Sequence, residues 1–297
     1  MYWLQSSTRA ERMILNGRHL LAYLCAALLL VGCKPKPVGT TLRISMIPTT
    51  DPGKIARQSA PLVDYLQKET GATVDLTVPT SYAAVVEALT NGKVDIAYLG
   101  GFTYVQASSR AQVTPLVQRL SDKSFHSVFV TQPDSPIHTL ADLKGHTFAF
   151  GDVNSTSGHL MPSFYMRQEN VDPMVIEKAI YTGGHDATAL AVANRKMDAG
   201  AMDELVLQKM LKSGKLTSSQ IRIFYTTPPF FDYVWVARSG LDPNLAGKFS
   251  QALLKLNSSD PADKQLLDLL NAEKYEPAHA TDYNPLRQAA KDDGLMK

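Results

Sequence analysis

Hydrophobic and polar positions follow two alternating periods along this 297-residue chain. Short apolar runs with the period of about two residues that marks strands precede longer stretches with the period of about 3.6 residues that marks helices. The order strand, helix, strand, helix, strand occurs between residues 42 and 99 and again between residues 147 and 202. This alternation predicts an α/β fold with mixed, mostly parallel sheets covered by helices.

The two halves share one register. The expected strands are residues 42–47, 73–78 and 94–99 in the first half, and 147–150, 179–181 and 197–202 in the second. The expected helices are residues 55–70 and 82–91, and stretches beginning at Gly158 and His185. At an offset of 103 residues, Ala84, Ala88, Asn91, Lys93 and Asp95 coincide with Ala187, Ala191, Asn194, Lys196 and Asp198. We therefore expect two similar lobes.

The lobes are expected to face each other across a cleft, because ligands bind outside the carboxyl ends of parallel strands. Residues 125–131 and 232–237 are extended and apolar, and suit two crossovers between the lobes. The first lobe is then residues 41–128 plus 230–297, and the second is residues 129–229. Helices after Pro243 and Pro261 are expected to pack on the first lobe.

The N-terminal region resembles a bacterial lipoprotein signal peptide. Residues 1–33 have a basic start, then an apolar stretch too short to cross a bilayer comfortably, then Leu30-Val31-Gly32-Cys33. This ending resembles the lipobox, so we expect cleavage before Cys33, lipidation of that cysteine and a tether over residues 34–40. The expected location is the periplasm or cell envelope. An uncleaved membrane anchor is the alternative, and Met13 is an alternative start.

Composition narrows the function. The chain has 30 Lys and Arg against 28 Asp and Glu, and removing residues 1–33 leaves 27 of each. A neutral exported part without a basic stripe excludes nucleic acid as a partner. That part also loses Cys25 and uses Cys33 for lipid, so it has no disulfide and no thiolate metal site.

Three small hydroxyl side chains, Ser155, Thr156 and Ser157, lie between the strand expected at residues 147–150 and the next helix. The first N–H groups of a helix lack partners within it, and the helix dipole places partial positive charge there. Hydroxyl groups at this position can therefore help to bind an anion. The run is also typical of an ordinary helix N-cap, which is the structural alternative.

His185 follows two glycines at the start of another expected helix. The helix dipole favours a neutral ring there, which with hydroxyl and N–H groups could surround a small tetrahedral oxyanion. Asp203 and Asp232 would repel a fully deprotonated anion, but would accept hydrogen bonds from a protonated oxyanion or an ammonium group. Each residue also has an interpretation without ligand binding. His185 could be a surface turn residue, Asp203 could cap a helix, and Asp232 could lie on a crossover strand. Tyr98 is the first candidate for a ligand-binding hydroxyl, and Tyr82 the second.

These motifs resemble the periplasmic solute-binding proteins of phosphate, phosphite and phosphonate ABC importers. The resemblance rests on residues 154–158 with Pro162, on Gly183-Gly184-His185-Asp186 and on residues 95–104, and it covers nearly all of the exported part. It implies the two-lobed, hinge-closing fold of type II, with the oxyanion bound by Ser155, Thr156, Ser157 and His185. By position, Asp203 and Asp232 resemble the acidic residues of relatives that bind aminophosphonates.

Two departures leave the ligand open. Gly100-Gly101 stands where many relatives have Gly-Pro, and residues 226–233 look more like a branch often described as binding selenate or another oxyanion. The resemblance implies a monomer that binds a small oxyanion and delivers it to an ABC permease. The alternative within the family is a sensory subunit that signals to a kinase.

An enzyme is the third function class. Ser155, His185 and Asp203 have the residue types of a hydrolase triad, but the chain has no Gly-x-Ser-x-Gly motif. Its histidines are scattered and form no His-Glu-x-x-His motif. We therefore expect no catalytic residue, no metal and no cofactor.

Overall fold

A computed structural model describes residues 39–173, 176 and 178–296 of the chain. The expected signal peptide, Cys33 and all but the last two residues of the tether lie outside these residues. Residues 41–297 form one compact unit. Within the described residues, no helix is long and apolar enough to cross a membrane.

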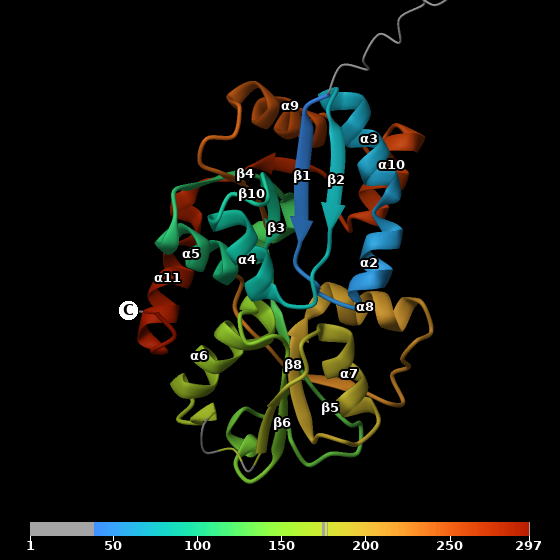
Figure 1. Cartoon of the computed structure of the whole chain (residues 1–297). Helices are drawn as coiled ribbons and strands as arrows, with labels where there is room; N and C mark the ends of the chain where they lie inside the picture. Colours follow the sequence, from blue (N-terminus) through green and yellow to red (C-terminus); the bar gives the residue numbers. More distant parts are fainter. Residues whose placement is uncertain (1–38, 174–175, 177, 297) are drawn as a thin grey trace, which may run out of the picture. The chain divides into compact units, whose positions relative to one another are not determined.

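The first of two sheets has the strand order β11-β4-β10-β3-β1-β2 (Figure 1). Its strands are β1 Thr41–Met46, β2 Thr73–Thr77, β3 Ile96–Leu99, β4 Val113–Arg119, β10 Val234–Arg238 and β11 Tyr275–Pro277. Strand β1 is parallel to its neighbours β2 and β3, whereas β10, β4 and β11 add three antiparallel pairings.

The second sheet has the order β7-β6-β8-β5-β9. Its strands are β5 Ser127–Thr131, β6 Thr147–Phe150, β7 Lys178–Tyr181, β8 Ala199–Asp203 and β9 Arg222–Thr226. Here β6 is parallel to β7 and β8, and β5 is antiparallel to β8 and β9. The prediction of an α/β fold with mixed sheets is confirmed, but parallel pairings are not the majority in either sheet. Strands that enter from the other lobe supply part of the antiparallel pairing.

Two connections join the two sheets, and most of the residues expected to cross, 125–131 and 232–237, belong to strands β5 and β10 instead. One leads from β4 to β5 and the other from β9 to β10, and they pair at Phe125 and Phe230 through two backbone hydrogen bonds of 2.9 Å. Because β5 begins at Ser127, the strand that receives the first connection already belongs to the second sheet. The lobe boundaries at residues 128 and 229 stay a prediction.

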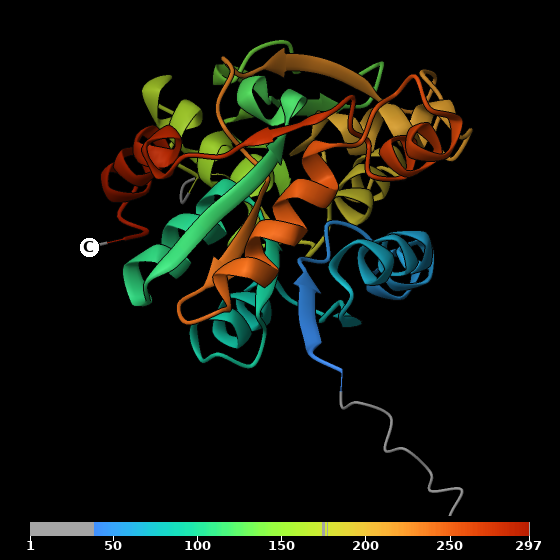
Figure 2. The same cartoon turned by 90° about the horizontal axis from the view of Figure 1, so that it is seen from above.

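Helices cover both faces of each sheet. They are α2 Pro52–Gln58, α3 Ala60–Thr70, α4 Tyr82–Thr90, α5 Gly101–Arg110, α6 Met161–Gln168, α7 His185–Ala193, α8 Glu204–Lys212, α9 Pro243–Leu254, α10 Pro261–Leu269 and α11 Asn284–Asp292. Along β10, Val234 and Val236 pack with α4, α5 and α11, whereas Trp235 packs with α3, α9 and α10. In Figure 2, α11 (red) and the pair α2 and α3 (blue) lie on opposite sides of the unit. Helices α9 and α10 pack with α3 against the first sheet, and the lobe division that includes them stays a prediction.

The offset of 103 residues reappears in the element bounds. Helix α4 begins at Tyr82 and α7 at His185, and both have nine residues. Helix α5 begins at Gly101 and α8 at Glu204. The predicted repeat therefore has a structural counterpart in these two pairs of helices.

Two expected helices differ from the prediction. Residues 55–70 form two helices rather than one, because Pro61 lacks an N–H group and its ring obstructs the carbonyl of Arg57. The chain breaks at Ser59, whose hydroxyl donates to the Ile55 carbonyl at 2.8 Å. The helix expected from Gly158 begins as a π-helical turn, Thr156–Leu160, before α6 starts at Met161.

Candidate functional site

The candidate site lies where strand ends and helix starts of both sheets meet. Seven of the eight predicted ligand-binding residues are almost completely buried, and Tyr98 is half-buried. These buried residues are Tyr82, Ser155, Thr156, Ser157, His185, Asp203 and Asp232. Buried polar side chains need hydrogen-bond partners, so their partners indicate what each one can do.

The three hydroxyl residues of the loop after β6 have different partners. The Ser155 Oγ accepts a hydrogen bond from the Gly158 N–H at 3.0 Å and caps the π-helical turn. The Thr156 Oγ1 accepts one from the Phe102 N–H at 3.0 Å, at the start of α5. Among the described residues, the Ser157 Oγ is buried without a hydrogen-bond partner. The Ser155 side chain also hydrogen-bonds to Tyr82. The O–H group of Ser157 is therefore available to an acceptor that enters the site, and that of Ser155 would exchange Tyr82 for the acceptor.

Tyr82 and His185 face each other, although they lie 103 residues apart in sequence. The Tyr82 hydroxyl is 3.5 Å from the His185 Nε2, at the limit of hydrogen-bonding distance. The backbone N–H group of each residue donates to the opposite half of the repeat. The His185 N–H donates to the Thr49 carbonyl at 3.0 Å, and the Tyr82 N–H donates to the Asp152 side-chain Oδ2 at 3.4 Å. Thr49 and Asp152 are also 103 residues apart, so the repeat brings equivalent junctions together.

His185 has the environment of a neutral donor. Burial lowers the pKa of its ring, and the nearby carboxylates of Asp203, Asp186 and Asp152 oppose this shift only partly. The Asp203 N–H donates to the Nδ1 at 3.2 Å, so the proton of the neutral ring lies on the Nε2, which faces Tyr82. Burial is the main cause that lowers the pKa of His185, an effect that the prediction from sequence did not include.

Asp232 lies at the start of α5. Its Oδ1 accepts from the Gly101 N–H at 3.0 Å, a donor that a proline at this position would lack, and its carboxyl also bonds to the Thr156 side chain. The Asp232 Oδ2 is buried and has no hydrogen-bond partner among the residues that the structure describes. Burial raises the pKa of Asp232 to about 7. A glycine is needed at position 100, because a Cβ there would lie 3.0 Å from the Thr156 Oγ1 and 3.2 Å from the Asp232 Oδ1.

Asp203 is the N-cap of α8. Its Oδ1 accepts from the Leu205 N–H at 2.7 Å and from the Val206 N–H at 3.0 Å. Its Oδ2 accepts from the Tyr233 hydroxyl at 2.8 Å. The structural alternative for Asp203 is thus present. Its Oδ1 already accepts two hydrogen bonds, and only Oδ2 can accept a further one.

Tyr98 lies apart from the hydroxyl loop. Its ring stacks on Tyr233 with 5.3 Å between the ring centroids, and it also contacts Trp235. The two tyrosine candidates therefore occupy different places, with Tyr82 against His185 and Tyr98 against the aromatic wall. Burial raises the pKa of Tyr82 well above its usual value, so its hydroxyl keeps the proton and can donate.

Sequence reasoning missed several participants in this site. Thr49 and Asp152 hold the two helix starts, and Gly100 allows Thr156 and Asp232 to approach. The repeat could have indicated Thr49 and Asp152, because they are equivalent positions. Nothing near Gly100 in sequence predicts its two neighbours.

The arrangement can surround a small anion with neutral donors. Hydroxyl groups of Ser155, Ser157 and Tyr82 and the N–H of His185 are present, without a lysine or arginine among the predicted ligand-binding residues. Among the described residues, no cluster of three or more His, Cys, Asp or Glu side chains could hold a metal ion.

Comparison with known proteins identifies the family to which the chain belongs. The sequence model of a family described as "ABC transporter, phosphonate, periplasmic substrate-binding protein" matches residues 44–283. A probable ABC transporter phosphite binding protein, PhnD1 of Prochlorococcus marinus, is 28% identical over 289 residues, which cover 92% of this chain and 97% of that protein. The phosphate-import protein PhnD of Mycolicibacterium smegmatis is 32% identical over 247 residues, which cover 75% and 77%.

A solved structure shares the two-lobed architecture. The structure of Prochlorococcus marinus PhnD1 in complex with methylphosphonate superposes with a TM-score of 0.82. The superposition covers 86% of this chain and 99% of PhnD1, at 28% identity. The expected resemblance and the two-lobed fold are thereby confirmed.

Proposed function

Because this chain belongs to the family of periplasmic substrate-binding proteins of phosphonate ABC transporters, we propose that it binds a small phosphorus oxyanion between its lobes. The proposed ligand is phosphite or a short phosphonate. The ligand-binding residues are Ser155, Ser157, Tyr82 and His185 as donors, with Thr156, Asp203, Asp232 and Tyr98 around them. Members of this family bind substrates for transport and are not enzymes.

The observation that carries this proposal is the contact between Tyr82 and His185 beside an unpartnered Ser157 hydroxyl. The two rings come from equivalent helix starts in different lobes, so closing the cleft would bring their donors to one point. An oxyanion there would accept hydrogen bonds from both lobes and would stabilise the closed form.

The pKa of Asp232 favours a phosphorus acid over a sulfate-like ion as the ligand. With a pKa of about 7, its carboxyl can be protonated and donate to an oxyanion, or ionised and accept from a P–OH group. A sulfate-like dianion carries no proton to donate to the ionised carboxylate. The same argument extends to selenate, which was left open by the sequence.

The proposed partner is an ABC permease, and the proposed membrane attachment is a lipid on Cys33. A monomer that closes on its ligand would present one continuous surface to the permease. The alternative partner, a sensor kinase, uses the same site. Radiolabelling with palmitate, in wild type and in Cys33→Ala, tests the anchor; an unlabelled wild-type protein would refute it.

The ligand itself is tested by isothermal titration calorimetry. We expect binding of phosphite or methylphosphonate, weaker binding of selenate and sulfate, and a loss of about 1–3 kcal/mol in His185→Ala because an oxyanion lone pair stays unpaired. No binding of any of these phosphorus acids would refute the proposed function. Unchanged affinity in His185→Ala would refute the site.

A further inference from the structure

A second feature of the cleft lies beside the oxyanion site. A cavity of about 150 Å³ opens between α2 of the first lobe and α8 of the second. Its lining includes two aromatic residues, Tyr98 and Tyr233, and three lysines, the half-buried Lys54 and the exposed Lys209 and Lys215. Ser155, Thr156, Ser157, His185 and Asp232 do not line it.

The charge of this lining is unbalanced. It contains four cationic side chains, the three lysines and Arg119, and two carboxylates, Asp186 and Asp203. Arg119 is neutralised by Asp122, to which it donates from its Nε at 2.9 Å. In the part of the chain that the structure describes, none of the three lysine ammonium groups forms an ion pair with a carboxylate. The cavity therefore has unpaired positive charge.

The lysines also oppose one another across the cleft. The Lys215 ammonium lowers the pKa of Lys54, burial and the charge of Lys209 add to this effect, and the Asp186 carboxylate opposes it only partly. Lys54 belongs to α2, whereas Lys209 lies on α8 and Lys215 follows it. Bringing the lobes together thus places like charges side by side, which costs free energy unless an anion lies between them.

The cavity and the oxyanion site share a wall. Thr49, whose carbonyl accepts from the His185 N–H, lines the cavity, and so does Asp203, whose N–H donates to the His185 Nδ1 at 3.2 Å. The two sites are therefore adjacent, and the substituent of a phosphonate held at His185 would pass Thr49 and Asp203 to enter the cavity.

We propose that this cavity receives the substituent of a phosphonate ligand whose far end carries a second anionic group, such as a carboxylate. This inference rests on the proposed function. The phosphonate group stays at His185 and the hydroxyl loop. The second anion lies between Lys54 and Lys215, with Lys209 beside it, and the aromatic rings of Tyr98 and Tyr233 contact the carbon chain.

A simple amine-ended substituent fits this cavity less well. Asp203 is the carboxylate nearest to His185 and could accept an ammonium group there, but its oxygens already cap α8 and bind Tyr233. Beyond Asp203, an ammonium group would meet the three lysines. The balance of charge therefore favours a carboxylate-ended phosphonate over 2-aminoethylphosphonate.

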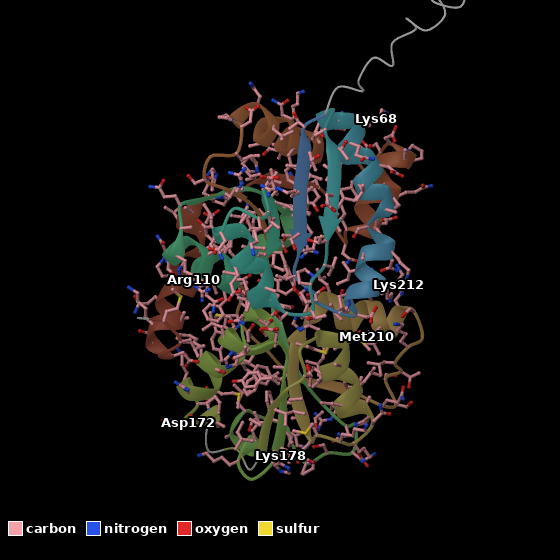
Figure 3. The ribbon with its side chains drawn as sticks, in the orientation of Figure 1. Lys68, Arg110, Asp172, Lys178, Met210 and Lys212 are labelled. Carbon is pink, nitrogen blue, oxygen red and sulfur yellow. The ribbon has the colours of Figure 1, made fainter. Side chains whose placement is uncertain are left out.

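The test compares methylphosphonate, 3-phosphonopropionate and 2-aminoethylphosphonate by titration calorimetry. The variants are Lys54→Met, Lys215→Met and the control Lys212→Met. Lys212 lies on α8 close to the cavity residue Met210, and both are labelled in Figure 3. Lys212 is exposed, as Lys209 and Lys215 are, but it does not line the cavity. Methionine keeps much of the length and the apolar stem of lysine and removes only the charge.

We expect wild type to bind 3-phosphonopropionate at least about tenfold more tightly than 2-aminoethylphosphonate, as charge-assisted hydrogen bonds to the lysines would allow. Lys54→Met and Lys215→Met should each weaken 3-phosphonopropionate about tenfold and leave methylphosphonate unchanged or bound more tightly, because the repulsion between the lysines is relieved. Lys212→Met should behave as wild type.

Two outcomes overturn the inference while leaving the proposed function intact. The first is equal affinity for the three ligands with methylphosphonate still bound, and the second is an equal effect of the lysine variants on all ligands. A two-site isotherm with methylphosphonate plus free acetate would also overturn it, because the lysines would then bind a separate anion. If no phosphonate binds at all, both proposals fall.

Discussion

The helices α5 and α8 begin at equivalent positions of the repeat, yet their first N–H groups are capped in different ways. Asp203, the N-cap of α8, bonds to the N–H groups of Leu205 and Val206 with its own side chain. Gly100, its equivalent at α5, has no side chain. The donors at the start of α5 bond instead to Asp232 and Thr156, which are 131 and 54 residues away from them.

The cap of α8 is local, because it comes from the residue next to the helix, whereas the cap of α5 is tertiary, because it comes from residues distant in sequence. The cap of α8 is built into its own helix, so it persists whatever the arrangement of the lobes. The cap of α5 combines a residue of the second connection with one from the loop after β6, and it exists only where these segments meet. We infer that the start of α5 is the helix end whose hydrogen bonds respond to closure of the cleft, and that α8 serves as the fixed counterpart.

The largest expected effect concerns the titration of Asp232 at α5. Its folded pKa of about 7 lies above the value of 3.8 for an unperturbed aspartate, so folding favours the protonated carboxyl. The free energy of unfolding should then fall as pH rises from about 4 to about 7, by on the order of 4 kcal/mol. Asp232→Asn carries no charge at any pH and should lack this fall.

Chemical denaturation of wild type and Asp232→Asn at pH 5 and pH 8 measures this effect. The variant should gain stability relative to wild type between the two pH values. A difference between the proteins that is the same at both pH values would contradict the tertiary cap as a titrating element.

A somewhat smaller effect is expected at α8. Asp203→Ala removes the cap and leaves the buried Tyr233 hydroxyl without its acceptor, at a combined cost of about 2–4 kcal/mol of unfolding free energy. Asp203→Asn is the matched control, because asparagine is an equally good N-cap through its one side-chain oxygen, while its NH2 group can donate to the Tyr233 oxygen in place of the lost acceptor. Equal destabilisation by both substitutions, measured by urea denaturation, would mean that the charge rather than the cap matters here.

The third prediction tests whether the cap of α5 depends on closure. Thr156→Val removes the acceptor of the Phe102 N–H and should weaken phosphite or phosphonate binding by about 1–3 kcal/mol, whereas Thr156→Ser should keep most of the affinity. Amide exchange in wild type should be faster for Phe102 than for Leu205 without ligand, and ligand should slow Phe102 alone. Equal protection of the two amides in the free protein would break the comparison.

Local patterns predicted the elements well. The strand at residues 147–150 and the helix starts at Tyr82 and His185 agree with the structure, because periodicity and glycine punctuation act within a few residues. The antiparallel strands β4, β9 and β11 were not predicted. Their pairing joins distant segments, as in β11 with β4, and nothing in the nearby sequence specifies such partners.

The features of the site also divide into those that local sequence predicts and those that depend on distant segments. The hydroxyl loop and His185 were predicted because they stand at helix starts, where the requirement for donors is local. The approach of Asp232 to Gly101 and the separation of Tyr98 from Tyr82 depend on the crossing of the chain between lobes. The ligand-binding role of all these residues stays a prediction until the titrations are done.

Substitution of Ser157 should have the smallest effect on the free energy of unfolding, and the sign of that effect is the informative result. It neighbours Thr156 but caps neither α5 nor α8, and its buried hydroxyl has no partner. Ser157→Ala should raise the free energy of unfolding by about 1 kcal/mol or less, because an unpaired polar group is removed, and should still weaken oxyanion binding.

Ser155→Ala is the matched control: it removes the acceptor of the Gly158 N–H and should lower stability by about 1 kcal/mol. Thermal denaturation of the two variants should show changes in stability of opposite sign, and titration should show the weaker oxyanion binding of Ser157→Ala. A destabilised Ser157→Ala would mean that its hydroxyl supports the fold, and would remove it from the donors reserved for the ligand.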